Sequence, residues 1–156
     1  MLNIAIPGRV GYKFKYLVLD LNGTITLDGG IIDGVENRLR QLSSLLSISI
    51  VTADTRGTAQ RLAVSLQGEI HKIDAGKEDA QKLALVQKLG KEATICIGNG
   101  SNDATMLEKS ALGICILGRE GASADAIMNA DLIVPDINDA LDLLLNPKRL
   151  VATLRK

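Results

Sequence analysis

Aromatic residues are almost absent from this chain of 156 residues, which has no Trp, one Phe and two Tyr. Proteins that bind single-stranded nucleic acid stack bases on aromatic side chains, so a surface of that kind is not expected. Positive charge is not in excess either, because 18 Lys and Arg balance 18 Asp and Glu. We therefore expect no nucleic-acid partner, and a core built from Ile, Leu, Val and Ala.

Long hydrophobic runs are also missing, and none approaches the ~20 residues that a membrane-spanning helix needs. The first 14 residues do not resemble a signal peptide, because their short apolar run is followed at once by Pro7 and charged residues. Cys96 and Cys115 lie in apolar, strand-like runs that are typical of buried reduced thiols, with a disulfide or a metal pair as the alternative. These absences predict a cytoplasmic protein without a membrane partner.

What the sequence does contain is a regular alternation of apolar strands and amphipathic helices. A hairpin is expected over residues 24–33, around Asp28 and Gly29. Strands that alternate with helices of this length are typical of βα units and a parallel sheet. The predicted fold class is therefore α/β, as a single three-layer α/β/α, Rossmann-like domain over residues 1–156 with a mostly parallel central sheet. Strands are expected at 16–21, 47–52, 69–73, 94–98, 112–117 and 131–135, with 2–6 at an edge, and helices at 34–46, 56–66 (capped by Thr55), 77–90, 101–109, 122–129, 138–145 and 147–156.

Polar residues follow four of the predicted strands at the point where each strand ends. In parallel sheets, ligands bind beyond the carboxyl ends of the strands. The loops that begin at Asp20, Thr52, Asp74 and Gly98 are therefore expected to converge on one site. Each loop carries polar groups that can bind phosphate or a metal ion.

Asp20 ends the first predicted strand of the parallel sheet, where a carboxylate can attack phosphorus and form an acyl phosphate. The amides of residues 21–24 can turn toward the phosphoryl oxygens, and Gly23 lets the backbone approach them closely. Carboxylate and phosphate oxygens repel each other, and a divalent cation together with a lysine would offset this repulsion. Mg²⁺ suits such a set of oxygen ligands.

Four segments, in order along the chain, resemble the motifs of the haloacid dehalogenase superfamily. DLNGT (20–24) resembles the DxDGT of its phosphatases, IVTAD (50–54) its second motif, and Lys77 at the head of a helix its third. IGNGSNDATML (97–107) resembles the fourth motif, GDGxND, of phosphoserine phosphatases and P-type ATPases, and the stretch that follows, up to residue 134, is also similar. The resemblance covers about residues 16–145 and points to a soluble relative of the P-type ATPase phosphorylation domain.

The resemblance implies a role for each matched residue. Asp20 would be the nucleophile, Thr52 would hydrogen-bond the phosphoryl group, and Lys77 would neutralise it. Mg²⁺ would be the cofactor and a small phosphorylated metabolite the substrate. The implied site comprises the catalytic residues Asp20, Asn22, Thr52 and Lys77, the substrate-binding residues Gly23, Thr24, Ala53 and Asp54, and the metal-binding residues Asp20, Asn22 (through its carbonyl), Asn99 and Asp103, with Asn102 and Asp103 mostly supporting the ligands.

Some of these residues have simpler interpretations. Thr52 could only end a strand, Asp54 could be a turn residue before a helix, and Asp103 could cap its helix. Lys82 is a rival of Lys77. The predicted core positions of that helix, which are Ala80, Leu83, Val86 and Leu89, leave Lys82 toward solvent, so we favour Lys77.

Two residues depart from the family pattern. Asn22 stands where the phosphatases have an Asp that acts as general acid and base, and losing such catalysis typically costs about 10²–10⁴-fold. Asn99 stands where the family has a metal-binding Asp, so the site loses one negative charge. We expect a slow Mg²⁺-dependent phosphohydrolase or phosphotransferase. The alternative is a catalytically weak or silent module with a binding or regulatory role, including a slow phosphoaspartyl switch.

Cap domains of this superfamily are inserted between the first and second motifs, or between the second and third. Here those gaps are 27 residues (25–51) and 24 residues (53–76), which leaves no room for a cap. Capless relatives, such as the phosphatase that acts on 3-deoxy-octulosonate phosphate, often form tetramers through a hairpin like 24–33. The resemblance therefore implies a homo-oligomer, as a dimer or a tetramer.

Overall fold

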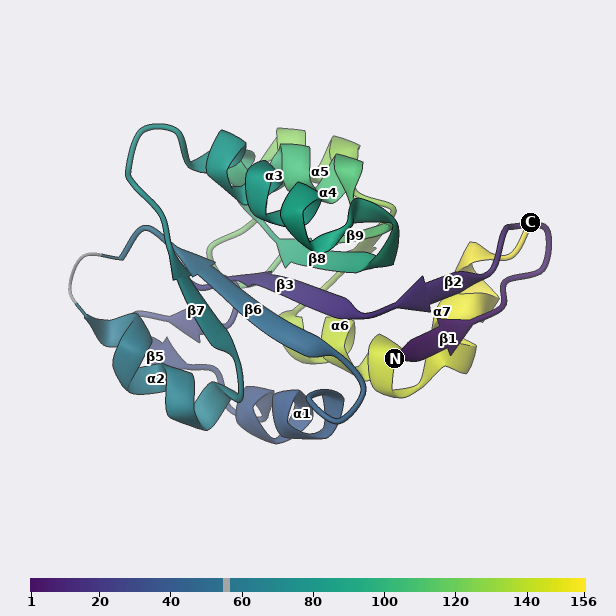
Figure 1. Ribbon diagram of the computed structural model, residues 1–156, viewed down its shortest axis with the longest axis horizontal. Helices are drawn as coiled ribbons and strands as arrows, with labels where there is room; N and C mark the ends of the chain where they lie inside the picture. The colour runs from purple at the N-terminus through teal and green to yellow at the C-terminus, as the bar shows by residue number, and fades with distance from the viewer. Residues whose placement is uncertain (55–56) are drawn as a thin grey trace.

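The computed structural model describes residues 1–54 and 57–156 (Figure 1). The predicted cap Thr55 lies outside these residues. Within them, the helix that follows the second strand of the sheet begins at Thr58, directly after Gly57 in a left-handed conformation (φ 71°).

A six-stranded sheet, parallel throughout, forms the middle layer. In its register, Leu19 of the third strand in the chain pairs with Ile50 on one side and with Ile97 on the other. The mostly parallel sheet that the sequence predicts is confirmed. Its strands, in spatial order, are β10 (Leu132–Val134), β9 (Leu112–Ile116), β8 (Thr94–Gly98), β3 (Tyr16–Asp20), β6 (Ser47–Thr52) and β7 (Glu69–Lys72).

Helices cover both faces of this sheet and complete the predicted three layers (Figure 1). One face carries α3 (Glu78–Leu89), α4 (Ala104–Lys109) and α5 (Ala124–Asn129), with the short 3₁₀ turns η1 (Lys91–Ala93) and η2 (Ser101–Asp103) beside them. The other face carries α1 (Val35–Leu42), α2 (Thr58–Leu66) and α6 (Ile137–Leu145), and α7 (Pro147–Leu154) follows α6. The first predicted helix, 34–46, is shorter than expected.

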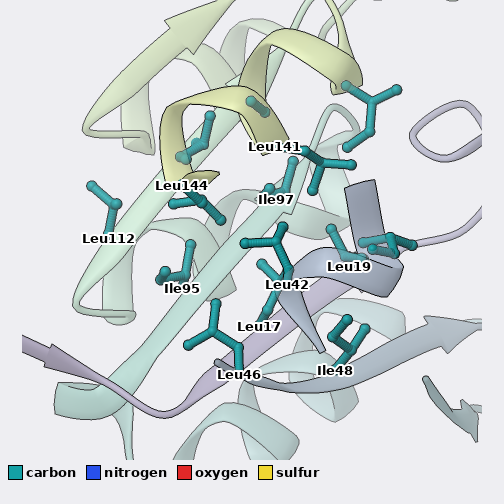
Figure 2. Packing of buried hydrophobic residues seen from close by; sticks show 14 of the residues in the cluster. Leu17, Leu19, Leu42, Leu46, Ile48, Ile95, Ile97, Leu112, Leu141 and Leu144 are labelled. Atoms are coloured by element: carbon teal, nitrogen blue, oxygen red, sulfur yellow. The ribbon is translucent and has the colours of Figure 1, made fainter. Parts of the chain in front are cut away.

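The hydrophobic core is split by the sheet into two clusters. Alternate side chains of a strand point to opposite faces, so Leu17 and Leu19 of β3 belong to the larger cluster and Val18 to the smaller one. In the larger cluster, Leu141 and Leu144 of α6 lie over the strands, as Figure 2 shows. Because β3 is buried on both faces, its last residue is held firmly at the edge of the layer.

The N-terminal strand is not at an edge of the central sheet, so that prediction was wrong. β1 (Leu2–Ile4) instead pairs antiparallel with β2 (Tyr12–Phe14) in a separate two-stranded ribbon. β2 leads almost directly into β3, and it gives β1 a neighbour that is close along the chain. The C-terminus lies against this ribbon, where the amide of Lys156 donates to the carbonyl of Pro7 (3.2 Å).

The predicted hairpin is present, as β4 (Thr26–Leu27) and β5 (Gly30–Ile31). Its two turn residues, Asp28 (φ 52°) and Gly29 (φ 81°), are both left-handed, as the favoured two-residue hairpin turn requires. Among the described residues, this hairpin and α1 are the elements between β3 and β6, and α2 and β7 are those between β6 and α3. The described chain thus contains no cap at either position.

Candidate active site

A hollow of about 400 Å³ lies beyond the carboxyl ends of the central strands. Asp20 ends β3, Thr52 ends β6, and Asn99 directly follows β8, so three neighbouring strands each bring one polar side chain to it. Three of the four loops that the sequence predicts to converge therefore do so, whereas the loop that begins at Asp74 lines a different hollow. The hollow is lined by Asp20, Asn22, Thr52, Ala53, Asp54, Glu78, Lys82, Asn99, Gly100, Asn102 and Glu120.

Lys82 lies at the centre of the polar contacts of this hollow. Its Nζ is 2.9 Å from Oδ1 of Asp20, 2.7 Å from Oδ1 of Asp103 and 3.2 Å from Oδ1 of Asn102. Its side chain is only 1% exposed. Burial lowers the pKa of Lys82, but the charges of Asp20 and Asp103 outweigh that effect and raise it overall. Lys82 therefore remains an ammonium ion that neutralises the two carboxylates.

The prediction that Lys82 faces solvent and that Lys77 enters the site was wrong. Lys77 is exposed at the N-terminal end of α3 and lines a different hollow with Gln81. The buried face of α3 runs through Lys82 and Val86, whereas Ala80, which the sequence placed in the core, is exposed. The predicted face included Val86 but excluded Lys82, because an apolar pattern does not mark a charged residue at a buried position.

Asp103 is fully buried and supports the site from behind. Its Oδ1 accepts the hydrogen bond from Lys82, and its Oδ2 accepts from the backbone amides of Asn99 (3.0 Å) and Gly100 (2.9 Å). Both oxygens thus face protein donors, and Asp103 does not line the hollow. The structure places it as a support for Lys82 and the turn after β8, rather than as a direct metal ligand.

Thr24 links the nucleophile position to the residue after β8. Its hydroxyl lies 3.5 Å from Oδ2 of Asp20 and 3.3 Å from Oδ1 of Asn99. Thr24 is fully buried and does not line the hollow, so its predicted substrate contact is not found in the structure. The hydroxyl instead fixes the orientation of the two side chains that do line it.

The remaining predicted substrate-binding residues divide between two hollows. Thr52, Ala53 and Asp54 line the site together, and the amide of Asp54 donates to the hydroxyl of Thr52 (3.0 Å). Gly23 lines a neighbouring, mostly apolar hollow of about 650 Å³ between the hairpin and the start of α6. Gly23 therefore lies between the polar site and this second hollow.

Asp20 is the most strongly perturbed carboxyl of the site. Burial, followed by the charge of Asp103, raises the pKa of Asp20 to about 7, while Lys82 acts in the opposite direction. A cationic group near Asp20 is thus needed to keep it ionised and nucleophilic. Lys82 supplies one positive charge. Because the pKa of Asp20 is raised even beside Lys82, a second positive charge nearby would further favour the ionised carboxylate.

The sequence interpretation weighed Lys82 and rejected it, and it missed two acidic residues of the hollow, Glu78 and Glu120. Glu78 opens α3 and accepts a hydrogen bond from the side-chain amide of Asn102. A signal for Lys82 was available, because it lies four residues before Val86 and seven before Leu89, on one helix face. Glu120 lies in the loop between β9 and α5, and no motif marked it.

The comparisons with known proteins agree with this geometry. Residues 65–140 match the model of the haloacid dehalogenase-like hydrolases. The chain is 28% identical over 123 residues to a soluble P-type ATPase-like phosphatase of Methanocaldococcus jannaschii, with 77% of this chain and 45% of that protein covered. The chain thus resembles the haloacid dehalogenase-like hydrolases in sequence and shares the fold of that superfamily.

Two further relatives match different shares of the chain. The chain is 50% identical over 84 residues to an uncharacterised protein of Methanocaldococcus jannaschii, with 51% of this chain and 90% of that protein covered. It is 30% identical over 138 residues to a copper-exporting P-type ATPase of Staphylococcus aureus, with 85% of this chain and 16% of the ATPase covered. The chain thus spans less than half the length of the two P-type ATPase-like relatives. Among its described residues, no helix is both long and apolar enough to cross a membrane.

Solved structures of the superfamily share the fold. The 3-deoxy-D-manno-octulosonate 8-phosphate phosphatase of Moraxella catarrhalis, solved with magnesium, phosphate and KDO, has a TM-score of 0.70 and 17% identity, covering 91% of this chain and 94% of that one. The cobalt-bound deoxy-D-mannose-octulosonate 8-phosphate phosphatase of Haemophilus influenzae has a TM-score of 0.72 and 12% identity, covering 92% and 94%. At this identity the likeness shows the fold alone.

The donors around the hollow fit a hard divalent cation. Asp20 and Asn99 offer side-chain oxygens, and Asn22 lines the same hollow. The described residues contain no group of three or more His, Cys, Asp and Glu that could hold a metal ion. Oxygen donors with a single strong carboxylate suit Mg²⁺, which retains several waters, better than they suit zinc.

Proposed function

We propose that this protein is a Mg²⁺-dependent phosphohydrolase that forms an aspartyl phosphate on Asp20 with a small phosphorylated metabolite. The observation that carries the proposal is the contact of one buried ammonium, Lys82, with Asp20 (2.9 Å) and Asp103 (2.7 Å) at the floor of the hollow. A charge that is buried this completely has a large desolvation cost. A structural role alone would be served as well by apolar residues, whereas an attack by Asp20 on a phosphate anion requires this charge.

The two oxygens of Asp20 have different roles in this proposal. Oδ1 is held by Lys82 at 2.9 Å, while the contact of Oδ2 with the hydroxyl of Thr24 is long, at 3.5 Å. Oδ2 is therefore the oxygen that attacks phosphorus. The new bond joins Oδ2 to phosphorus, the bond from phosphorus to the leaving oxygen breaks, and that oxygen keeps the electron pair and takes a proton from water. Thr52, at the end of the neighbouring strand β6, would hydrogen-bond the phosphoryl group.

The cation would be held by Asp20, by the backbone carbonyl of Asn22 and by the side-chain oxygen of Asn99. When bound, Mg²⁺ supplies positive charge that reduces the repulsion between the carboxylate and the phosphate. Asn99 offers an amide oxygen where the resemblance implies a carboxylate, and this reduces the attraction for the cation. We therefore expect weak Mg²⁺ binding.

Turnover is expected to be slow for a second reason. Asn22 lines the hollow at the position where a general acid and base is implied by the resemblance. Its amide can donate and accept hydrogen bonds but cannot take up or release a proton near neutral pH. Both the protonation of the leaving group and the activation of water must then rely on other groups.

The experiment is the hydrolysis of p-nitrophenyl phosphate by the full chain, with and without Mg²⁺. We expect slow, Mg²⁺-dependent release of p-nitrophenol that Asp20→Asn abolishes and Asn22→Asp increases. Lys77→Met serves as the control, because Lys77 is exposed and outside the site. Equal rates for the wild type and Asp20→Asn would reject the proposal.

A second function is favoured by Asn22 and Asn99 themselves. Asn22 and Asn99 stand where the family pattern has two carboxylates. A silent binding module, or a switch with a long-lived aspartyl phosphate, would tolerate the loss of both. Such a switch would become labelled on Asp20 by a small phosphodonor and would lose the label slowly, without sustained turnover. Absence of any label, with no activity in Asn22→Asp, would favour the silent module.

Assembly and location complete the proposal. Apolar residues of the hairpin, Leu27 and Ile31, face the start of α6 across the hollow of about 650 Å³. By analogy with capless relatives, we propose that this hairpin joins copies of a cytoplasmic protein into a dimer or a tetramer. Size-exclusion chromatography with light scattering, on the wild type and on Ile31→Ser, tests this: a monomeric wild type would reject it.

A further inference from the structure

Glu78 and Glu120 are acidic side chains of the hollow to which neither the family motifs nor the mechanism above gives a role, and Glu78 already accepts a hydrogen bond from Asn102. Glu120 belongs to the loop between β9 and α5, is exposed, and lines the hollow together with Asp20 and Asn22. Resting on the proposed function, we propose that Glu120 is the general base that activates water for the hydrolysis of the aspartyl phosphate on Asp20. It thereby provides the chemistry that Asn22 cannot.

Backbone geometry brings this carboxylate next to the nucleophile loop. A Cβ at Gly23 would overlap Oε2 of Glu120, and the same Cβ would lie 3.3 Å from Nδ2 of Asn99. The side chain of Glu120 thus occupies the space that a larger residue at position 23 would fill. Gly23 directly follows Asn22, so the carboxylate of Glu120 lies beside the position of the missing acid and base.

The loop that carries Glu120 is fastened to the site by Asn99. The side-chain amide of Asn99 donates to the carbonyl of Gly121 (2.9 Å), and the amide of Ser123 donates to the backbone carbonyl of Asn99 (2.9 Å). A carboxylate at position 99 has no proton to donate to the carbonyl of Gly121. The residue that weakens the expected cation site is therefore the one that holds the Glu120 loop in place.

Gly118, at the start of the loop that carries Glu120, also lies close to the loop after β3. It is left-handed (φ 56°), and a Cβ at this residue would lie 3.6 Å from the carbonyl oxygen of Gly23. The loops 20–24 and 118–121 thus pack directly against each other. A base on the second loop acts across the hollow on a phosphoryl group attached to the first.

The step balances as an ordinary hydrolysis. A water molecule forms a bond to phosphorus through its oxygen and gives one proton to the carboxylate of Glu120. The bond between phosphorus and Oδ2 of Asp20 breaks, and its electron pair returns to the Asp20 carboxylate. Inorganic phosphate leaves, and Glu120 releases its proton to solvent, to which it is open.

The test is a time course of p-nitrophenol release by Glu120→Gln in the presence of Mg²⁺, together with acid-quenched measurement of phosphoryl groups on the protein. Because Glu120 acts only after Asp20 is phosphorylated, we expect a rapid first turnover, accumulation of phosphorylated protein, and a steady rate lower by about 10²-fold or more. The double variant Glu120→Gln, Asn22→Asp is expected to recover turnover, since it restores a proton acceptor beside the same loop.

Glu92→Gln is the matched control, because Glu92 is an exposed glutamate in η1, before β8, at the opposite end of the strand from the site. It should behave as the wild type. Loss of both the first turnover and the steady rate in Glu120→Gln would overturn the role as a base for water, and so would an unchanged steady rate without accumulation. A wild type without Mg²⁺-dependent activity, or with activity that Asp20→Asn leaves unchanged, would instead reject the proposed function on which this role rests.

Discussion

Nζ of Lys82 lies between two carboxylates, 2.9 Å from Oδ1 of the partly exposed Asp20 and 2.7 Å from Oδ1 of the fully buried Asp103. Asp103 in turn binds the amides of Asn99 and Gly100. The end of β3, the middle of α3 and the turn after β8 are therefore joined through one ammonium group. Any change to that group should affect folding and chemistry together.

Replacement of Lys82 by Met should reduce Mg²⁺-dependent phosphatase activity by at least about 100-fold, as is typical when a charge-stabilising donor is removed. It should also lower the free energy of unfolding by about 3 kcal/mol or more, because two carboxylates, one of them fully buried, lose their partner. Kinetics and urea unfolding measure the two effects. Lys77→Met should change neither, and a larger loss in that control would restore Lys77 as the site lysine.

Gly98 ends β8 at a point where the backbone has no room for a side chain. A Cβ there would overlap the carboxyl group of Asp103. Gly98→Ala should displace Asp103, and with it Lys82, and should lower both stability and activity. Gly11→Ala is the control, because a Cβ at Gly11 would meet only the carbonyl of Ile4 at 3.8 Å. Thermal unfolding of both variants checks this, and equal midpoints would contradict the packing described here.

Asn99→Asp exchanges the hydrogen bond to Gly121 for a negative charge near Asp20. Without a divalent cation we expect a loss of about 1–3 kcal/mol of stability, since the carbonyl of Gly121 loses its donor. With Mg²⁺ the added carboxylate should be neutralised, so that the variant gains more stability from the ion than the wild type does. Thermal midpoints measured with and without Mg²⁺ decide this: identical shifts in the two proteins would place the cation away from residue 99.

A pH effect on stability is expected from Arg38 on α1 and Asp142 on α6. The guanidinium binds the carboxylate through two nitrogens (Nε–Oδ1 2.8 Å, Nη2–Oδ2 3.0 Å), and this hydrogen bonding lowers the pKa of Asp142. A depressed pKa contributes stability that is complete above the unfolded value of about 4 and is lost as the pH falls through the folded value. The pair is partly exposed, so its contribution is about 0.5–1 kcal/mol.

The measurement is a double-mutant cycle with Arg38→Met and Asp142→Asn. Stability is measured by urea unfolding at neutral pH and at a pH below the pKa of Asp142 in the folded protein. The coupling energy should be present in the first condition and absent in the second. A coupling that persists in acid would show that the two helices are held by packing alone.

The layers and the sheet could be predicted from the sequence because they depend on short-range patterns. Leu17 and Leu19, with Val18 between them, mark a strand that is buried on both faces, and Asp28 with Gly29 marks the hairpin turn. Asp20, Thr52 and Asn99 could be placed together because the carboxyl ends of parallel strands share one edge. The pairing of β1 with β2 could not, since two short strands carry no pattern that selects their partner.

Lys82 was assigned to the surface because charged side chains are rarely buried, although its spacing from Val86 and Leu89 places it on the buried face of the helix. Lys82 is stable in the interior only because Asp20 and Asp103, 62 and 21 residues away, approach it in the folded chain. Glu120 presents the same difficulty. Its place beside Gly23 depends on how two loops pack, and no local spacing records that contact.

The most direct test of the account is mass spectrometry of the acid-quenched protein after incubation with p-nitrophenyl phosphate and Mg²⁺. We expect one phosphoryl group on the peptide that contains Asp20, absent from Asp20→Asn and unaffected in Lys77→Met. A phosphoryl group on another residue, or release of p-nitrophenol by Asp20→Asn at the wild-type rate, would contradict it.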